Sequence, residues 1–178
     1  EKDTIVATGG HDQSCGGLGV GAIEAGMAAY SIGTVECITP AFSTCVIDET
    51  MRLSNLATYP HVIDKLYTTV AFNMTGGSGL KWFRDTLGEY EKEQAQKSGG
   101  DVYELLLKEM PENPTNVLVL PYFTSTGTPY FDANPISAIL GLELTTTKGQ
   151  MLKGLLEGIT FEMKLNLELL RKSGIIVN

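Results

Sequence analysis

One carboxylate in the chain stands where it could act on a bound ligand. The segment Ala7–Ala22, ATGGHDQSCGGLGVGA, follows a short apolar run and contains a single acidic residue, Asp12. Aspartate is a favoured N-cap residue, and its charge suits the positive end of a helix. A carboxylate at a strand-to-helix junction also points out of the sheet edge, where α/β proteins bind ligands. The two interpretations are compatible, so Asp12 is a candidate both for capping and for catalysis.

Two further segments have the composition of anion-binding turns. Ser31–Thr34 (SIGT) offers two hydroxyls, and at Gly33 a backbone that a phosphate can approach closely. The same residues also suit an ordinary hairpin turn. Thr75–Gly79 (TGGSG) leads into a helical segment whose bare N-terminus could receive a nucleotide, or these small residues could simply cap it.

Other chemistries lack the spacing that they need. Gly17–Ala22 matches the pattern G-x-G-x-x-A, but Asp12 and Gln13 are among the residues that separate it from the preceding strand. No acidic residue follows at the distance that a dinucleotide fold requires, so that fold is disfavoured. Metal ligands usually come in paired spacings. The candidate ligands lack such spacings, and we predict no metal site from His11, Cys15, Cys37 and Cys45.

The elements that must position these residues predict an α/β domain with a mixed sheet and flanking helices. Predicted strands and hairpin runs cover residues 4–7, 27–39 (around Gly33), 42–47, 65–73 and 117–121, with a further strand from 175. Predicted helices cover 12–25, 79–88, a segment capped by Asp101, and 148–173 ended by Gly174. The charged stretch 89–100 is expected to be solvated.

Composition excludes several classes of protein. The 178 residues are 43% hydrophobic and 19% charged, which is ordinary for a globular domain. A net charge of −8 argues against a nucleic-acid or anionic-membrane partner. No apolar run is long enough to span a membrane, and no signal peptide is recognisable. Three cysteines without framework spacing favour a reducing, cytoplasmic compartment. Both ends look cut, so we expect a fragment.

Five ordered blocks resemble the FGGY carbohydrate kinases, which include glycerol, xylulose, ribulose and fuculose kinases. The blocks are GGHDQ (9–13), SIGT (31–34), GGSGLKWFRD (76–85), LVLPYFTSTGTPYFDANPISAILGL (118–142) and TTTKGQMLKGLLEGITFEMK (145–164). The resemblance implies an actin-like, ribonuclease H-like fold with two lobes. Residues 1–25 would end the N-terminal lobe, and 26–178 would form the C-terminal lobe, truncated before its adenosine motif.

The resemblance also implies roles for particular residues. Asp12 would be the general base that takes the proton of the attacking sugar hydroxyl, and Gln13 would contact the substrate. Gly33 and Thr34 resemble the second phosphate loop. Gly77 and Lys81 match positions that line the nucleotide, although Lys81 replaces the glutamine expected in glycerol kinases. ATP and Mg²⁺ are the implied cofactors, with Mg²⁺ held mainly through the phosphates.

The expected function is therefore transfer of the γ-phosphoryl of ATP to a hydroxyl of a ketose or polyol. The alternative is a non-catalytic, actin-like nucleotide-binding module, which would have no need of a carboxylate at Asp12. The expected partners are the sugar or polyol and the missing N-terminal lobe, and a homodimer is possible. Without that lobe, residues 1–178 alone are expected to be inactive.

Overall fold

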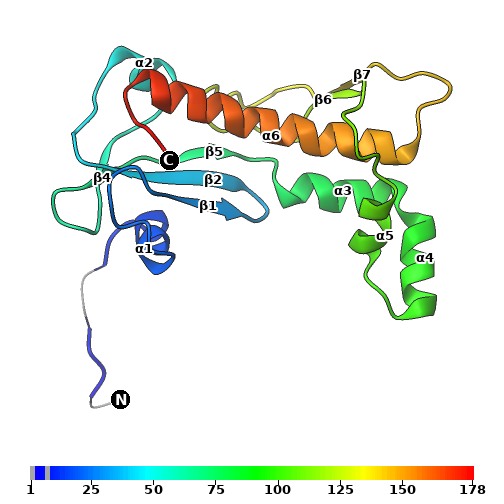
Figure 1. Cartoon of the computed structure of the whole chain (residues 1–178), viewed down its shortest axis with the longest axis horizontal. Coiled ribbons are helices and arrows are strands. Elements are labelled where there is room, and N and C mark those ends of the chain that lie inside the picture. Colours follow the sequence, from blue (N-terminus) through cyan, green and yellow to red (C-terminus); the bar gives the residue numbers. More distant parts are fainter. Residues whose placement is uncertain (1–2, 7–8) are drawn as a thin grey trace.

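The elements gather in two groups along one long helix (Figure 1). The structure is a computed structural model that describes residues 3–6 and 9–178. Helix α6 (Lys148–Lys172) runs along the molecule, with the main sheet and α1 (Asp12–Gly19) beside its C-terminal half. A group of shorter helices lies beside its N-terminal half. Within the described residues, none of the helices combines the length and the apolar character that a bilayer crossing requires.

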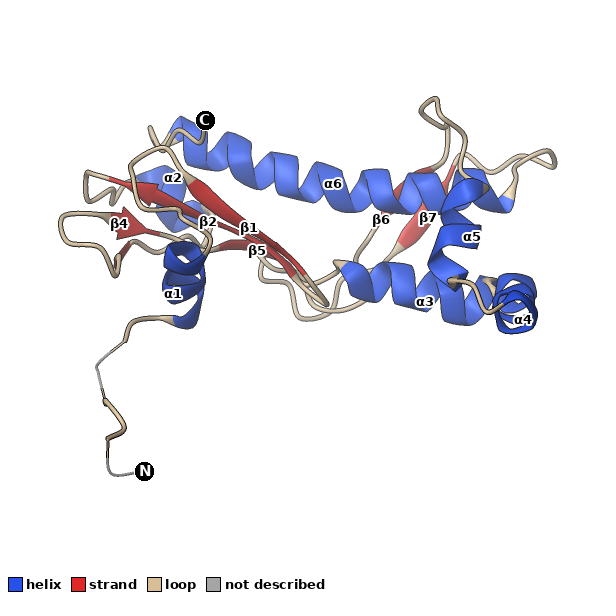
Figure 2. Ribbon diagram, turned by 60° about the horizontal axis from the view of Figure 1, so that its bottom comes forward, coloured by secondary structure: helices blue, strands red, loops and turns tan. Residues whose placement is uncertain are grey.

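In the described part of the chain, the main sheet has five strands, with β2 at its centre. Strand order is β1 (Ala28–Ile32), β2 (Glu36–Phe42), β4 (Tyr67–Thr68) and β3 (Tyr59–Pro60), while β5 (Ala71–Asn73) pairs with another part of β2. Every residue of β2 is buried, because α1 packs on one face of the sheet and α6 on the other (Figure 2). The predicted α/β architecture is confirmed, but the pairings among the described strands are all antiparallel, so the sheet is not mixed.

The predicted hairpin around Gly33 is confirmed. β1 and β2 pair antiparallel, with Ser31 opposite Cys37 and Ile32 opposite Glu36. This register leaves residues 33–35 at the tip. The hairpin therefore carries the SIGT motif to one end of the sheet, next to the start of α3 (Gly77–Leu87).

Capping residues set the helix boundaries much as the sequence predicts. Thr147 and Gln150 form a capping box at the start of α6, and Gly174 adopts a φ of +77° after its end. Asp101 caps α5 (Val102–Lys108) by accepting from the backbone N–H of Tyr103 at 2.7 Å. α3 begins two residues before the predicted start, at Gly77.

α1 is shorter than the predicted helix over 12–25. It ends at Gly19, and Gly21 follows with a left-handed φ of +85°. The backbone N–H of Ala22 donates to Gly17 O, and that of Gly21 donates to Leu18 O, which together make a Schellman motif. Glycines lower the intrinsic stability of this helix, and one of them, Gly21, also terminates it.

The charged stretch 89–100 is helical and not merely solvated, which corrects the prediction. α4 (Glu89–Ser98) buries Glu91 and Ala95 and ends at Gly99, whose φ is +69°. Local composition does not predict this helix, because its buried face includes an acid, Glu91, whose partner Lys148 lies on α6. Lys148 Nζ contacts the Glu91 carboxylate from 57 residues further along the chain.

Several strand boundaries also differ from the prediction. The run 65–73 is split into β4 and β5, and β2 ends at Phe42, so that 43–47 is a loop. Residues 4–6 form no strand because no neighbouring strand pairs with them, and Ala7 lies outside the described residues. Residues 175–178 form none either, although the Asn178 N–H donates to Gly26 O beside β1. The predicted strand at 117–121 is β6 (Leu118–Leu120), and elements that the sequence did not predict are α2 (Glu49–Leu53), β3 and β7 (Ala138–Leu140).

Candidate functional site

The Asp12 carboxylate is fixed in place and open to solvent. Asp12 is the first residue of α1, and the N-cap is its neighbour His11, so the predicted cap moves by one residue. The backbone N–H of Gln13 donates to Asp12 Oδ1 at 2.8 Å and to His11 Nδ1 at 3.3 Å. The Asp12 side chain is nevertheless 85% exposed. A carboxylate held at the positive end of a helix, with one oxygen free, can accept a proton from a bound hydroxyl.

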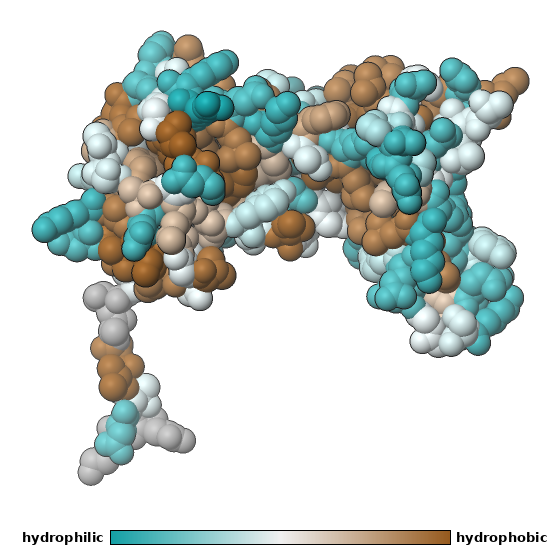
Figure 3. All heavy atoms as spheres, viewed as in Figure 1, coloured by the Kyte–Doolittle hydropathy of each residue, from teal (hydrophilic) through white to brown (hydrophobic). Residues whose placement is uncertain are grey.

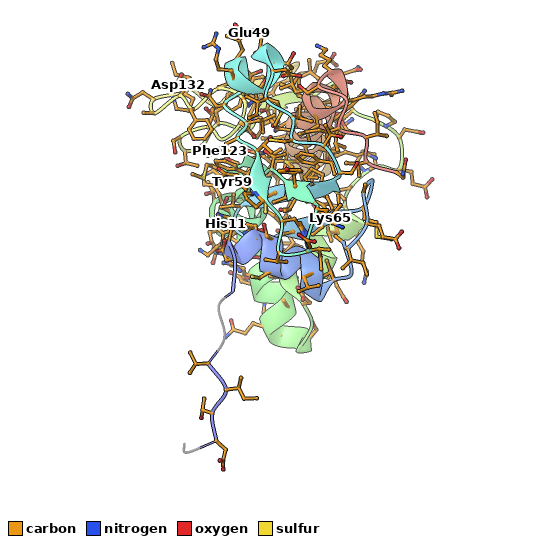
Figure 4. The ribbon with its side chains drawn as sticks, turned by 90° about the vertical axis from the view of Figure 1, so that its left-hand side faces the viewer. His11, Glu49, Tyr59, Lys65, Phe123 and Asp132 are labelled. Atoms are coloured by element: carbon orange, nitrogen blue, oxygen red, sulfur yellow. The ribbon has the colours of Figure 1, made fainter. Side chains whose placement is uncertain are left out.

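His11 is oriented by the sheet. Its ring stacks on Tyr59 of β3, with centroids 5.8 Å apart and planes at 15°, and Figure 4 shows the two side chains together above α1. His11 Nδ1 lies 3.2 Å from Asp12 Oδ1. The stacking therefore links the N-cap of α1, the residue before Asp12, to the sheet.

Gln13 joins α1 to the central strand. Its Oε1 accepts from the Cys37 thiol at 3.2 Å, and Cys37 is buried opposite Ser31 of β1. Burial raises the pKa of this thiol; a hydrogen bond with Ser31 opposes that rise and the nearby Asp12 charge adds to it. Among the residues that the structure describes, the amide NH₂ of Gln13 has no such bond, so it is a donor for a ligand.

The hairpin tip and the start of α3 form one rigid unit. The backbone N–H groups of Gly76 and Ser78 donate to Thr34 O at 3.1 and 3.4 Å, and that of Gly77 donates to Gly33 O at 2.7 Å. The Ser78 hydroxyl also donates to Thr34 O, at 2.9 Å. The helix N-terminus is therefore not bare, as the sequence suggested. Its first amides hold the turn, which leaves the exposed Thr34 side chain as the available hydroxyl.

Lys81 lies one turn into α3 and is 65% exposed. Its Nζ donates to Asp85 Oδ2 at 2.8 Å, and Arg84 binds the other oxygen of the same carboxylate at 2.7 Å. Lys81 can exchange this exposed partner for a ligand phosphate at little cost, because exposed ion pairs contribute only about 0–1 kcal/mol.

The structure brings the predicted residues together in two groups on one hairpin. Asp12 and Gln13 lie over the Ser31–Cys37 pair, while Gly33, Thr34, Gly77 and Lys81 lie at the tip and on α3. Ser31 lies two positions before the first residue of the tip, which corresponds to about 7 Å of strand. The two groups are therefore linked through the same hairpin.

The sequence did not identify two side chains of this region, Tyr30 and Glu36. The Tyr30 hydroxyl donates to Glu36 Oε2 at 2.7 Å, and Glu36 is only 8% exposed. Burial raises the pKa of Tyr30, and the bond to Glu36 raises it further. Glu36 also packs on the backbone of Gly76, where a Cβ would lie 2.6 Å from Glu36 Cγ. The sequence feature that could have identified Glu36 is its position as the only acid in the apolar run ECITPAF.

We expect Gly77→Ala to lower the thermal unfolding midpoint. A Cβ at this position would lie 2.8 Å from Gly33 O, a backbone atom that the hairpin holds in place. Breaking the bond between Gly77 and the turn should cost about 1–3 kcal/mol. The matched control is Gly19→Ala in α1, where a Cβ meets nothing within 4 Å. Because alanine favours helix, that variant should gain up to about 1 kcal/mol. Equal midpoints for the two variants would contradict the docking of α3 on the turn.

No metal centre is evident in the part of the chain that the structure describes. There, no three His, Cys, Asp or Glu side chains come together as they would around an ion.

Comparisons with known proteins identify the family of the chain. Residues 28–178 match the model of the FGGY family of carbohydrate kinases, C-terminal domain. The xylulose kinase of Bacillus subtilis is 26% identical over 173 residues, which are 97% of this chain and 33% of that protein. The glycerol kinase of Coxiella burnetii is 28% identical over 158 residues, which are 86% of this chain and 29% of the relative.

Solved structures show the same fold. The crystal structure of xylulose kinase from Rhodospirillum rubrum superposes with a TM-score of 0.74 at 23% identity, over 94% of this chain and 31% of that one. The crystal structure of Plasmodium falciparum glycerol kinase with ADP superposes with a TM-score of 0.71 at 22% identity, over 93% of this chain and 32% of that one. The chain spans about a third of the length of the relatives that it matches. It belongs to the FGGY family of carbohydrate kinases, and residues 28–178 correspond to the C-terminal domain of that family.

Proposed function

We propose that the chain is part of an ATP-dependent kinase that transfers the γ-phosphoryl group to a hydroxyl of a ketose or polyol. The observation that carries this proposal is the exposed Asp12 carboxylate, held over the same hairpin whose tip presents Thr34. The relatives of the chain include xylulose, glycerol and gluconate kinases, which supports a carbohydrate substrate. The glycerol kinase structure with ADP supports a nucleotide as the second substrate.

In this proposal each residue does one part of the transfer. Asp12 accepts the proton of the attacking hydroxyl, so that the oxygen can form its bond to phosphorus as the bond to the ADP leaving group breaks. Gln13 donates from its amide NH₂ to a second substrate hydroxyl. The Thr34 hydroxyl donates to a phosphate oxygen, and Lys81 neutralises negative charge. Mg²⁺ would neutralise further charge through the phosphates.

We assign residues 1–25 to the end of the first lobe and 26–178 to the second lobe, before its adenosine motif. The exposed apolar residues of the α1 region support a missing neighbour there: Leu18 is 45% exposed, Val20 72% and Ile23 44%. Figure 3 shows hydrophobic atoms on the surface around α1. In the family the other lobe is a domain of the same chain, so residues 1–178 alone should not transfer phosphoryl groups.

The test of the function is ATP consumption by the complete protein. ADP release that requires an added ketose or polyol supports the kinase. Nucleotide binding with no carbohydrate-dependent turnover, across a panel of ketoses, polyols and sugar acids, would instead support the non-catalytic module.

We expect Thr34→Val to weaken the use of ATP more than the use of the carbohydrate. A hydrogen bond to a charged group contributes about 1.5–3 kcal/mol, so the KM for ATP should rise about 10- to 150-fold. Thr145→Val, which changes an exposed threonine far from the turn in sequence, is the control. Unchanged KM for ATP and unchanged kcat in Thr34→Val would mean that Ser31–Thr34 is an ordinary hairpin turn.

A further inference from the structure

The two faces of the β1–β2 hairpin are held by different partners. On the face that carries Ser31 and Cys37, Gln13 of α1 accepts from the Cys37 thiol. Glu36 lies on the opposite face, because side chains alternate along a strand, and it is only 8% exposed. Its Oε2 accepts from the Tyr30 hydroxyl at 2.7 Å, across a diagonal of the register that an aromatic side chain can span. This bond therefore ties β1 to β2 on the face away from α1.

Glu36 also contacts the backbone that docks α3 on the hairpin tip. A Cβ at Gly76 would lie 2.6 Å from Glu36 Cγ and 3.0 Å from Glu36 N, so the two residues touch directly. The Gly76 N–H donates in turn to Thr34 O at 3.1 Å. Figure 2 shows the end of the hairpin beside the start of α3. A continuous path of contacts therefore leads from the Tyr30 hydroxyl through Glu36 and Gly76 to the backbone of Thr34.

The carboxylate at position 36 does more than fill space. The next two residues of β2, Cys37 and Ile38, are buried and apolar. Replacing buried charged groups by well-packed apolar residues is often neutral or stabilising, so stability alone does not call for an acid here. An apolar side chain in place of Glu36 would lack the oxygen that accepts from Tyr30, and that bond would no longer hold it against Gly76. The bond therefore determines where the Glu36 side chain lies.

We propose that Tyr30 and Glu36 are positioning residues for the proposed phosphate turn. Their hydrogen bond holds Glu36 against Gly76, and this contact fixes the backbone of Gly33 and Thr34 in the geometry that receives ATP. The proposal rests on the proposed kinase function. Tyr30 and Glu36 act through the turn and do not touch the substrate themselves. Their loss should therefore affect the use of ATP and spare the carbohydrate, which the residues of α1 serve from the other face of the hairpin.

The first test measures the turn itself and does not depend on enzyme activity. In the complete protein, Tyr30→Phe should speed amide hydrogen exchange at Gly76 and Gly77 about threefold or more, because their N–H groups are bonded to the turn. Tyr122→Phe is the matched control. The Tyr122 hydroxyl also donates to a glutamate at 2.7 Å, but that residue is Glu162 of α6. The control should leave exchange at Gly76 and Gly77 unchanged.

The second test is kinetic and uses the same complete protein. Tyr30→Phe and Glu36→Ala should each raise the KM for ATP about three- to tenfold and leave the carbohydrate KM within about twofold. Glu36→Gln still offers an oxygen to the Tyr30 hydroxyl, so its KM for ATP should stay within about twofold. Combining Tyr30→Phe with Glu36→Ala should be little worse than either alone, because both remove the same bond. Tyr30→Phe keeps its ring and tests the bond even where Glu36→Ala fails to fold.

An unchanged KM for ATP in Tyr30→Phe would overturn the positioning role, whatever the exchange rates at Gly76 and Gly77. An equal rise in Tyr122→Phe would overturn it too, because the effect would then come from a general loosening of the domain. So would a KM for ATP that rises as much in Glu36→Gln as in Glu36→Ala, because the charge and not the hydrogen bond would then matter. The proposed function fails differently: the unaltered enzyme would show no carbohydrate-dependent ATP use, and hydrogen exchange would still decide whether the bond holds the turn.

Discussion

Asp12→Asn in the complete enzyme should lower kcat by about 10²- to 10⁴-fold, the usual contribution of a general base. Asparagine preserves the size of the side chain and can still accept from the Gln13 N–H, a bond that Asp12 Oδ1 makes at 2.8 Å. It cannot take a proton from the attacking hydroxyl. Because Thr34 and Lys81 are untouched, affinity for ATP should stay close to that of the unaltered enzyme. Initial rates at saturating ATP and carbohydrate, with ATP binding measured by calorimetry, separate the two effects.

The control for this variant is Asp64→Asn. Asp64 is also exposed, lies in the loop before β4, and loses the same charge on substitution. Its kcat should match that of the unaltered enzyme, so a general effect of net charge would be detected. Activity of Asp12→Asn within about threefold of the unaltered enzyme would exclude the proton-accepting role, since the expected loss is far larger.

Local signals were sufficient where short-range physics decides the structure. Asp101 and Thr147 accept from backbone N–H groups two or three residues later, and Gly174 takes a positive φ, so the limits of α5 and α6 follow from nearby residues. The β1–β2 hairpin is likewise local. Asp12 stands out because it is a single acid in a glycine-rich segment, and its catalytic role stays a prediction.

Long-range contacts account for what the sequence could not predict. The amides of Gly77 and Ser78 look free in the sequence, but the hairpin tip more than 40 residues earlier supplies their acceptors. Glu36 is a charged residue in a buried strand. Only the strand pairing explains its burial, because that pairing places Tyr30 diagonally opposite Glu36, where the Tyr30 hydroxyl donates to its carboxylate. α4 was taken for a solvated segment for the same reason, because the partner of Glu91 is on α6.

Lys148, the partner of Glu91, is the basis for the second large expected effect, which is on the free energy of unfolding. Glu91 of α4 is 1% exposed, and its carboxylate accepts from Lys148 Nζ at the start of α6. Glu109, at the end of α5, lies 3.4 Å from the same Nζ, so one ammonium joins three helices. Burial raises the pKa of the Glu91 carboxyl, but hydrogen bonds with Lys148, Glu109 and the backbone, together with the Lys148 charge, outweigh burial, and the net pKa lies below its ordinary value. The buried carboxylate is therefore charged and depends on Lys148.

Lys148→Met should destabilise residues 1–178 by about 3–5 kcal/mol, because it leaves a buried carboxylate without a counterion. Trp82, the one tryptophan of the sequence, packs against the core that α3, α5 and α6 share and reports unfolding by fluorescence. At an m-value of about 2 kcal/mol/M, the urea midpoint should fall by about 1.5–2.5 M. Lys164→Met is the matched control, since its pair with Glu168 on α6 is 3.9 Å long and both side chains are more than half exposed. It should cost no more than about 1 kcal/mol.

The pH dependence distinguishes an unpaired charge from a simple loss of packing. Without Lys148, burial should raise the pKa of Glu91 in the folded state above its unfolded value of about 4.3. The folded variant then binds a proton more tightly than the unfolded chain, so its stability rises as the pH falls through that raised pKa. The difference in midpoint from the unaltered protein should therefore shrink between about pH 7 and pH 5. Adding Glu91→Gln to Lys148→Met should recover most of the loss at pH 7. A deficit that persists unchanged at pH 5 and in the double variant would show that the Lys148 stem, and not its charge, holds the three helices together.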